Sequence, residues 1–163
     1  MKFAGLILIC VFFGSCLNDG NCLITSTNNI HIQFKKESNH KLDTALVIKT
    51  ISISGTDSII KVNTSASEVL IPIDIHSNTT SIVIRHTNSD STNVGLDTLQ
   101  VSYTGQSKVI AKDCGAFTYY QNLEMIKTNL KDSQIKIFST SLLKDPTLGN
   151  TPSAYAVNYQ IFY

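Results

Sequence analysis

Apolar and polar residues alternate along most of this chain with a period of two, the period of a β-strand. The clearest run is DTLQVSYTG, where Leu99, Val101 and Tyr103 would point to one side and Gln100 and Ser102 to the other. Similar runs elsewhere predict further strands, each with one buried face. The predicted core includes Ile32, Phe34, Ile71, Ile73, Ile82, Ile84, Leu99, Val101 and Tyr103.

The same alternation predicts which residues share a face in two less regular runs. Pro72 interrupts one of them, and because proline cannot donate a ladder hydrogen bond, that strand should lie at an edge or contain a bulge. A third run, NLEMIKTNL, could form a helix with Leu123, Ile126 and Leu130 on one face, but it lacks an N-cap box, so we favour a strand followed by a loop. The two shared faces are Val47, Lys49, Ile51 and Ile53, and Val69, Ile71, Ile73 and Ile75.

Segments rich in Gly, Pro, Asn, Asp and Ser separate these runs and predict turns between strands. Many short strands joined by turns favour an all-β fold. We therefore predict a single antiparallel β-sandwich of about seven or eight strands, immunoglobulin-like in general architecture. A small antiparallel barrel is the alternative.

The N-terminus has the order of an export signal. Lys2 is followed by an apolar run at 4–13, interrupted by one glycine, and then by the small residues Gly14 and Ser15 before Cys16. The run is too short for a spanning helix, which needs about 20 residues. The segment resembles a bacterial lipobox, whose cysteine is acylated and becomes the first residue of the mature chain. The alternative is a soluble secreted protein in which Cys16 is paired or free.

This interpretation divides the chain into a lipoprotein signal peptide at 1–15, a polar tether at 16–21 and a β-sandwich domain at 22–163. Cleavage would leave 163 − 15 = 148 residues, enough for one domain with a substantial core. The chain has 13 basic and 12 acidic residues, and Lys2 leaves with the signal, so the mature charges balance at 12 to 12. Without a basic field, we expect no nucleic-acid partner.

The sequence contains no strong catalytic or metal-binding motif. Its histidines are His31, His40, His76 and His86, which we interpret as surface or strand-end residues. Asp74 and His76 form the only tight pair of metal-ligand types, on one side of a predicted strand. A hairpin turning after this strand would not bring His86 to them. No G-x-S-x-G elbow is present. We therefore expect no catalytic residue, no metal site and no cofactor.

The positions of the four cysteines predict different roles for them. Cys10 would be removed with the signal and Cys16 would hold lipid, which leaves Cys22 and Cys114. In an oxidising compartment, such a pair forms a disulfide if the geometry allows it. The predicted bond would attach the start of the domain to the sandwich where the tether joins it. The alternative is two separate buried thiols.

Several motifs occur in an order that resembles a family of small Bacteroidota lipoproteins catalogued as a domain of unknown function. They are Cys16 and Cys22, Asp97 to Tyr103, Cys114-Gly115, Tyr119 to Leu123, and Ile161 to Tyr163. Ala116 departs from the family pattern, in which a bulky aromatic residue is commoner. The resemblance supports the fold and the export signal, and it brings no catalytic residues.

The resemblance also implies O-glycosylation of Asp-Ser or Asp-Thr sites followed by a small or aliphatic residue. Asp-Ser and Asp-Thr are also ordinary turn chemistry. The candidate sites are Thr44, Ser58, Ser91 and Thr98, of which Ser58 and Ser91 have the most loop-like contexts.

These observations predict a membrane-anchored bacterial lipoprotein whose biochemical function is a non-catalytic binding or envelope-assembly role. The predicted partners are the membrane, through the lipid anchor, and an envelope protein or glycan. We expect the outer membrane, with the domain on its periplasmic face. Tyr119 and Tyr120 are candidate anchors for a partner, although both could be partly buried. The alternative is a cell-envelope hydrolase or glycan-active enzyme with an unrecognised site.

Overall fold

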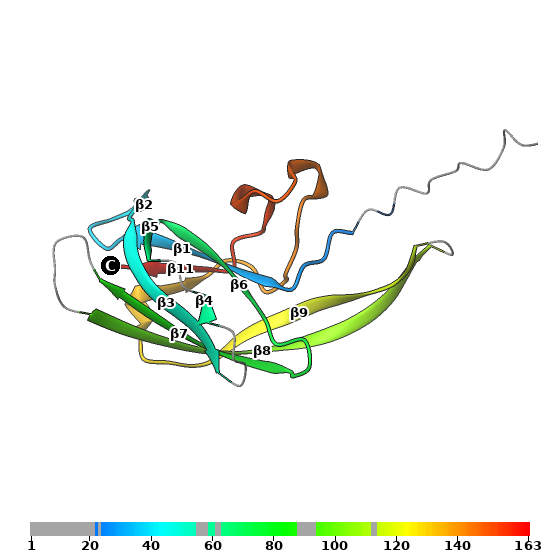
Figure 1. Ribbon diagram of the computed structural model, residues 1–163, viewed down its shortest axis with the longest axis horizontal. Helices are drawn as coiled ribbons and strands as arrows, with labels where there is room; N and C mark the ends of the chain where they lie inside the picture. The colour runs from blue at the N-terminus through cyan, green and yellow to red at the C-terminus, as the bar shows by residue number, and fades with distance from the viewer. Residues whose placement is uncertain (1–21, 23, 55–58, 61–62, 88–93, 112–113) are drawn as a thin grey trace, which may run out of the picture.

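The computed structural model describes residues 22, 24–54, 59–60, 63–87, 94–111 and 114–163, and it confirms the β-sandwich (Figure 1). Two sheets, of five and six strands, enclose the core. The described residues therefore contain eleven strands rather than the seven or eight expected, because short strands β2, β4, β5 and β10 add to the longer predicted runs.

The five-stranded sheet follows the order β10-β11-β1-β2, and β6 also pairs with β1. β1 and β11 are parallel, whereas the other pairs in this sheet are antiparallel. β1 pairs with β11, which lies near the end of the sequence. Segments far apart in sequence therefore meet at the centre of this sheet. The strands are β1 (Asn29–Lys36), β2 (Asn39–Asp43), β6 (Glu68–Pro72), β10 (Ile135–Ile137) and β11 (Tyr159–Phe162).

The six-stranded sheet follows the order β4-β3-β7-β8-β9, with β5 also paired to β3, and all its pairs are antiparallel. Three 3₁₀ turns, η1 (Asp132–Gln134), η2 (Pro146–Leu148) and η3 (Pro152–Ala154), lie in the connections near β10 and β11. The strands are β3 (Leu46–Ser54), β4 (Ile59–Ile60), β5 (Thr64–Ala66), β7 (Thr79–Thr87), β8 (Val94–Ala111) and β9 (Gly115–Thr128).

The core lies between the sheets and is mostly aliphatic. All nine predicted core residues are buried in it. Residues contributed by the C-terminal part of the chain complete it, including Leu142, Tyr159 and Ile161. The run at 122–130 continues β9 as a strand to Thr128, as favoured over a helix, with Leu123 buried and Ile126 exposed.

The predicted face of β3 is wrong in its first half. Leu46 and Ile48 are buried there, whereas Val47 is half-buried and Lys49 is exposed. A bulge between Ile48 and Thr50, in the pairing with β7, shifts the phase by one residue. Such a bulge places an extra residue in one strand, and side chains beyond it change face. Ile51 and Ile53 therefore point into the core as predicted.

Pro72 is the last residue of β6, which pairs only with β1 among the described strands, so the edge prediction is confirmed. The hairpin expected after this strand is wrong, because the chain crosses there to β7 in the other sheet. Asp74 and His76 consequently lie in a turn, where the Asp74 carboxylate accepts from the His76 N–H at 2.9 Å. Ile75, predicted on the buried face, is exposed.

Tyr103 holds this crossover in place. Its hydroxyl donates to the Asp74 carbonyl at 2.6 Å and lies 2.7 Å from the Thr80 hydroxyl. Burial raises the pKa of Tyr103, and the Thr80 hydrogen bond opposes that shift only in part. The phenol therefore keeps the proton that it donates to the crossover backbone.

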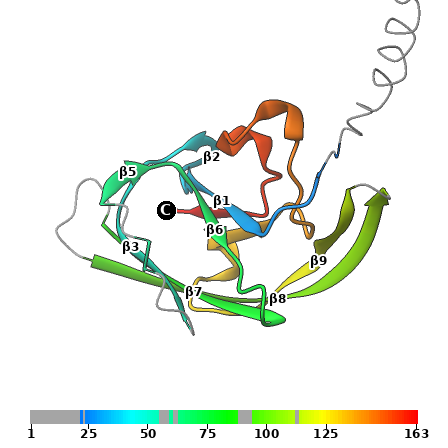
Figure 2. The same ribbon diagram turned by 45° about the vertical axis from the view of Figure 1, so that its right-hand side comes forward.

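The hairpin of β8 and β9 extends well beyond the sandwich as a curved two-stranded arm (Figure 2). β7 pairs with β8 only as far as Ser102, so residues 104–111 of β8 pair with β9 alone. A two-stranded ribbon is marginally stable in water. Contacts at the far end of this arm therefore matter to its order.

Candidate functional site

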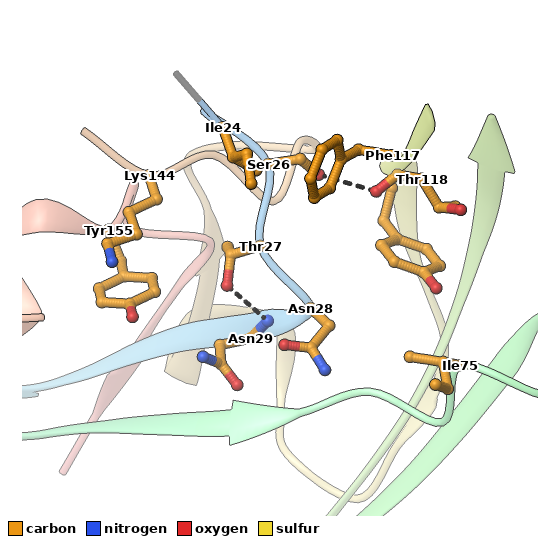
Figure 3. Close-up of a pocket in the computed structure, with 11 residues that line it drawn as sticks. Ile24, Ser26, Thr27, Asn28, Asn29, Ile75, Phe117, Thr118, Lys144 and Tyr155 are labelled. Atoms are coloured by element: carbon orange, nitrogen blue, oxygen red, sulfur yellow. Dashed lines mark hydrogen bonds between the residues drawn. The ribbon is translucent and has the colours of Figure 1, made fainter. Parts of the chain in front are cut away.

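A groove lies where the arm, the N-terminal segment at 24–28 and the loop at 138–158 meet (Figure 3). Its volume is about 530 Å³. This is within the usual range of small-ligand sites, roughly 300–1,000 Å³. The lining residues are Ile24, Ser26, Thr27, Asn28, Asn29, Ile75, Phe117, Thr118, Tyr120, Lys144 and Tyr155.

The N-terminal segment forms the middle of the groove, held on both sides by hydrogen bonds. On one side, the Ser26 hydroxyl donates to the Thr118 carbonyl of the arm at 3.1 Å. On the other, the N–H of Lys144 donates to the Thr25 carbonyl at 2.8 Å, and the N–H of Thr27 donates to the Leu142 carbonyl at 3.1 Å. The segment therefore joins the arm to the C-terminal loop.

A disulfide between Cys22 and Cys114 adds a covalent link at the end of this segment, and the predicted pairing is confirmed. The Cα atoms are 5.7 Å apart, within the usual range for disulfides. Cys114 lies in the turn between β8 and β9, at the tip of the arm. The bond therefore attaches the N-terminal segment to the arm tip, and not to the body of the sandwich as expected.

The loop that carries Lys144 and Tyr155 is held by a buried polar cluster on β1. The Asn158 side chain accepts from the His31 N–H at 3.0 Å and donates to the carbonyls of Ser139 and Ser141 at 3.1 Å. His31 Nδ1 lies 3.1 Å from the Tyr155 carbonyl, which can only accept, so this nitrogen carries a proton. His31 thereby fixes the backbone of Tyr155 beside the groove.

His31 is almost completely buried, with 1% of its surface exposed, so its interpretation as a surface or strand-end residue is wrong. Its Nε2 lies 3.1 Å from a carboxylate oxygen of Glu68 on β6, the neighbouring strand. The pairing of β1 with β6 creates this contact across 37 residues of sequence. His40 and His76 are exposed, as expected.

His86 is also buried, against the surface interpretation, and belongs to a second polar cluster between the two sheets. His86 Nε2 lies 2.9 Å from Oδ2 of Asp97, and the Tyr163 hydroxyl donates to the same oxygen. The Tyr163 ring packs edge-on against the His86 ring with 4.9 Å between centroids. Gly95 lies directly against that ring, and a Cβ there would approach it to 2.5 Å.

This cluster has a structural role, because it links the two sheets. Burial, followed by the Asp97 charge, holds the pKa of Tyr163 well above its usual range, so its hydroxyl remains a donor. Tyr163 follows β11 in one sheet and Asp97 belongs to β8 in the other, so the hydrogen bond joins the two sheets. Neither His86 nor His31 lines the groove.

Replacing Tyr163 by Phe should lower the free energy of unfolding by about 1–3 kcal/mol, because a buried carboxylate would lose one of its two donors. Urea unfolding of the purified protein measures the change. Tyr119→Phe is the control, because the Tyr119 hydroxyl makes no hydrogen bond to any described residue and should be dispensable. Equal stabilities of the two variants would contradict the structural role of Tyr163.

The remaining candidate sites are scattered. Cys16, Ser58 and Ser91 lie outside the described residues. Thr44 is partly exposed after β2, whereas the Thr98 hydroxyl donates to the Asn129 side chain at 3.2 Å. Tyr119 and Tyr120 are both partly buried. Tyr120 lines the groove and packs edge-on against Tyr103, and Tyr119 lies on the other side of β9 below Lys108.

The described residues offer neither a metal-binding cluster nor a membrane-spanning helix. They hold no group of three or more His, Cys, Asp or Glu side chains placed to bind a metal ion. They also hold no helix that is long and apolar enough to cross a membrane. The groove, whose volume lies in the range of small-ligand sites, is the candidate ligand site. The sequence does not predict the groove because its residues come from loops and strand ends of four distant segments.

Comparison with protein families identifies the chain. Residues 45–148 match the model of a family of unknown function, DUF6452, and the chain belongs to that family. The resemblance to a domain of unknown function is thus confirmed. Neither curated proteins nor solved structures provide a significant match.

Proposed function

We propose that this protein is a membrane-anchored bacterial lipoprotein that acts as a non-catalytic binding module of the cell envelope, with the groove beside its N-terminal segment as the binding surface. The main observation that supports this proposal is the Cys22–Cys114 disulfide. Such bonds form in oxidising compartments, which agrees with an export signal, and this one links the N-terminal segment that lines the groove to the tip of the arm.

The anchor follows from the residues before the domain. Cys16, behind Gly14 and Ser15, is the proposed acylation site, and a diacylated cysteine buries enough methylene for stable attachment. The tether spans 22 − 16 = 6 residues to Cys22. Fully extended, that is about 20 Å. The arm tip and the groove would therefore face the membrane to which the protein is attached, in our proposal the periplasmic side of the outer membrane.

A binding role agrees better with the geometry than an envelope hydrolase does. A general base must reach its substrate, directly or through one water. Both histidines and Asp97 are instead buried, where they hold the loop of Tyr155 and the C-terminal Tyr163 in place, and Glu68 is the one partly exposed member of the two pairs. The groove offers aromatic, hydroxyl and amide groups, which suit recognition.

Cys16→Ser should release the protein from membranes, because the serine cannot take the thioether-linked lipid. Membrane and soluble fractions of cells expressing the two forms are compared by immunoblot. Cys10→Ser is the matched control and should fractionate as the unmodified protein does, since Cys10 would be removed with the signal. A Cys16→Ser protein that stays fully in the membrane fraction would refute the anchor.

A further inference from the structure

We infer that the groove binds an anionic oligosaccharide, with sugar rings against its aromatic side chains and an acidic substituent near Lys144. This inference rests on the proposed function, because it names the ligand class of the binding surface described there. Three properties of the lining residues support it: exposed aromatic faces, unpaired amides and the sign of the charge.

The aromatic side chains stand on opposite sides of the groove. Tyr155 lies on one side of the N-terminal segment and Phe117 of the arm on the other (Figure 3). Tyr120, also in β9 of the arm, is the third aromatic residue of the lining. All three rings are partly exposed although they belong to a packed domain. Aromatic rings provide a rigid apolar surface that loses little conformational entropy on binding. Partly exposed rings on both sides of the groove suit the flat, partly apolar faces of sugar rings.

The amides of Asn28 and Asn29 lie between these aromatic sides (Figure 3). Neither side-chain amide is hydrogen-bonded to another described residue, so within the described part of the chain their donors and acceptors can serve a ligand. An asparagine side chain offers two donors and an acceptor on one planar group. Neighbouring hydroxyls of a sugar ring present donors and acceptors at matching separations. The hydroxyls of Ser26 and Thr27 are instead hydrogen-bonded within the protein. The two asparagine side chains are therefore the polar groups of this segment that a ligand can reach.

The charge of the groove is positive and comes from a single side chain. None of its lining residues is acidic, and Lys144 is the only basic one. The Lys144 ammonium lies 5.5 Å from the centroid of the Tyr155 ring and donates to the Asn150 side chain at 2.5 Å. An ammonium has three donors, so a ligand carboxylate can accept another. The cation is thus held beside the aromatic surface against which a sugar ring would lie.

Two properties argue against an extended peptide as the ligand. A peptide that adds to a sheet needs a free strand edge along the groove. Here the N-terminal segment already occupies the arm side through Ser26 and the loop side through Thr25 and Thr27. The second property is that the available polar groups of the groove are the side-chain amides of Asn28 and Asn29, which can hydrogen-bond to the hydroxyl groups of a sugar.

Isothermal titration calorimetry with defined tetrasaccharides tests the inference. The anionic probes are tetragalacturonate and the hyaluronan tetrasaccharide, and their neutral counterparts are tetragalactose and tetra-N-acetylglucosamine. We expect at least one anionic probe to bind with a Kd below about 1 mM, and its neutral counterpart to bind about tenfold more weakly. The mature protein in detergent and the full-length Cys16→Ser form are both titrated, so binding is measured separately from anchoring.

Four variants assign the binding to the groove. Tyr155→Ala and Asn28→Ala should weaken binding of both probes of the pair about tenfold, whereas Lys144→Gln should reduce the anionic affinity to that of the neutral counterpart. Tyr119→Ala is the control, since it removes an aromatic ring from the same arm outside the groove and should leave Kd unchanged. Urea unfolding confirms that each variant folds.

Two results would overturn the inference. One is the absence of binding by every anionic tetrasaccharide to folded protein at millimolar concentration. The other is binding that Tyr155→Ala and Lys144→Gln leave unchanged. Both results leave the membrane anchor untouched, because that is decided by fractionation of the Cys16→Ser protein.

Discussion

Replacing Val101 by Asp should abolish folding of the domain. Val101 is completely buried in the core, opposite Thr80 of β7 on one side and Met125 of β9 on the other. An unpaired buried charge costs several kcal/mol, against a typical total stability of about 5–15 kcal/mol. Near-ultraviolet circular dichroism and urea unfolding of the purified variant report the loss of the native state.

Gln100→Asp is the matched control one residue away. Gln100 is half-buried on the opposite side of β8 and pairs across the sheet with Lys127, so a carboxylate there stays near water and near a cation. Its free energy of unfolding should change by less than about 1 kcal/mol. If the two variants were equally stable, the assignment of the buried face of β8 would be wrong.

The faces of the long strands could be predicted because burial follows the strand period. In β1, β7 and β8 the predicted core residues are buried without exception. Prediction failed where the backbone departs from a regular strand. The bulge near Lys49 and the crossover after Pro72 both moved residues to another face, and neither leaves a distinct residue pattern.

The histidine partners could not be predicted because they depend on strand register. Asp97 pairs with Ile84 and Gly95 pairs with His86 across β7 and β8, so His86 and Asp97 are diagonal neighbours. A register shift of two residues would place them directly opposite each other in one direction and separate them in the other. Gly95 opposite His86 is the one local signal, since only glycine leaves room for the ring packed against it.

The candidate groove was predictable only at one edge. Pairing Cys22 with Cys114 correctly brought the N-terminal segment to the turn between β8 and β9. The other side depends on His31 and Asn158, which hold a loop that carries no periodic pattern. Lys144 and Tyr155 come from such a loop and meet the segment through contacts between residues far apart in sequence.

Removing the disulfide should cause the second large effect. The bond closes a loop of 114 − 22 = 92 residues. The chain-entropy model gives about 4.6 kcal/mol of stabilisation for such a loop. We therefore expect the Cys22→Ser, Cys114→Ser double variant to unfold at much lower urea concentration. The double variant is preferred because a single replacement would leave a thiol free to pair elsewhere.

In the double variant, the arm should lose its structure before the whole domain unfolds. Without the bond, the N-terminal segment is attached to the arm mainly through the hydrogen bond from Ser26 to Thr118, and the arm is a two-stranded ribbon beyond Ser102. Amide exchange at residues 104–111 and 115–119 should therefore rise under conditions in which the core strands remain protected. The groove would lose its arm side at the same time, so the inferred oligosaccharide affinity should fall in the folded double variant. Unchanged urea unfolding together with unchanged exchange in the arm would show that the disulfide contributes nothing to the order of the arm.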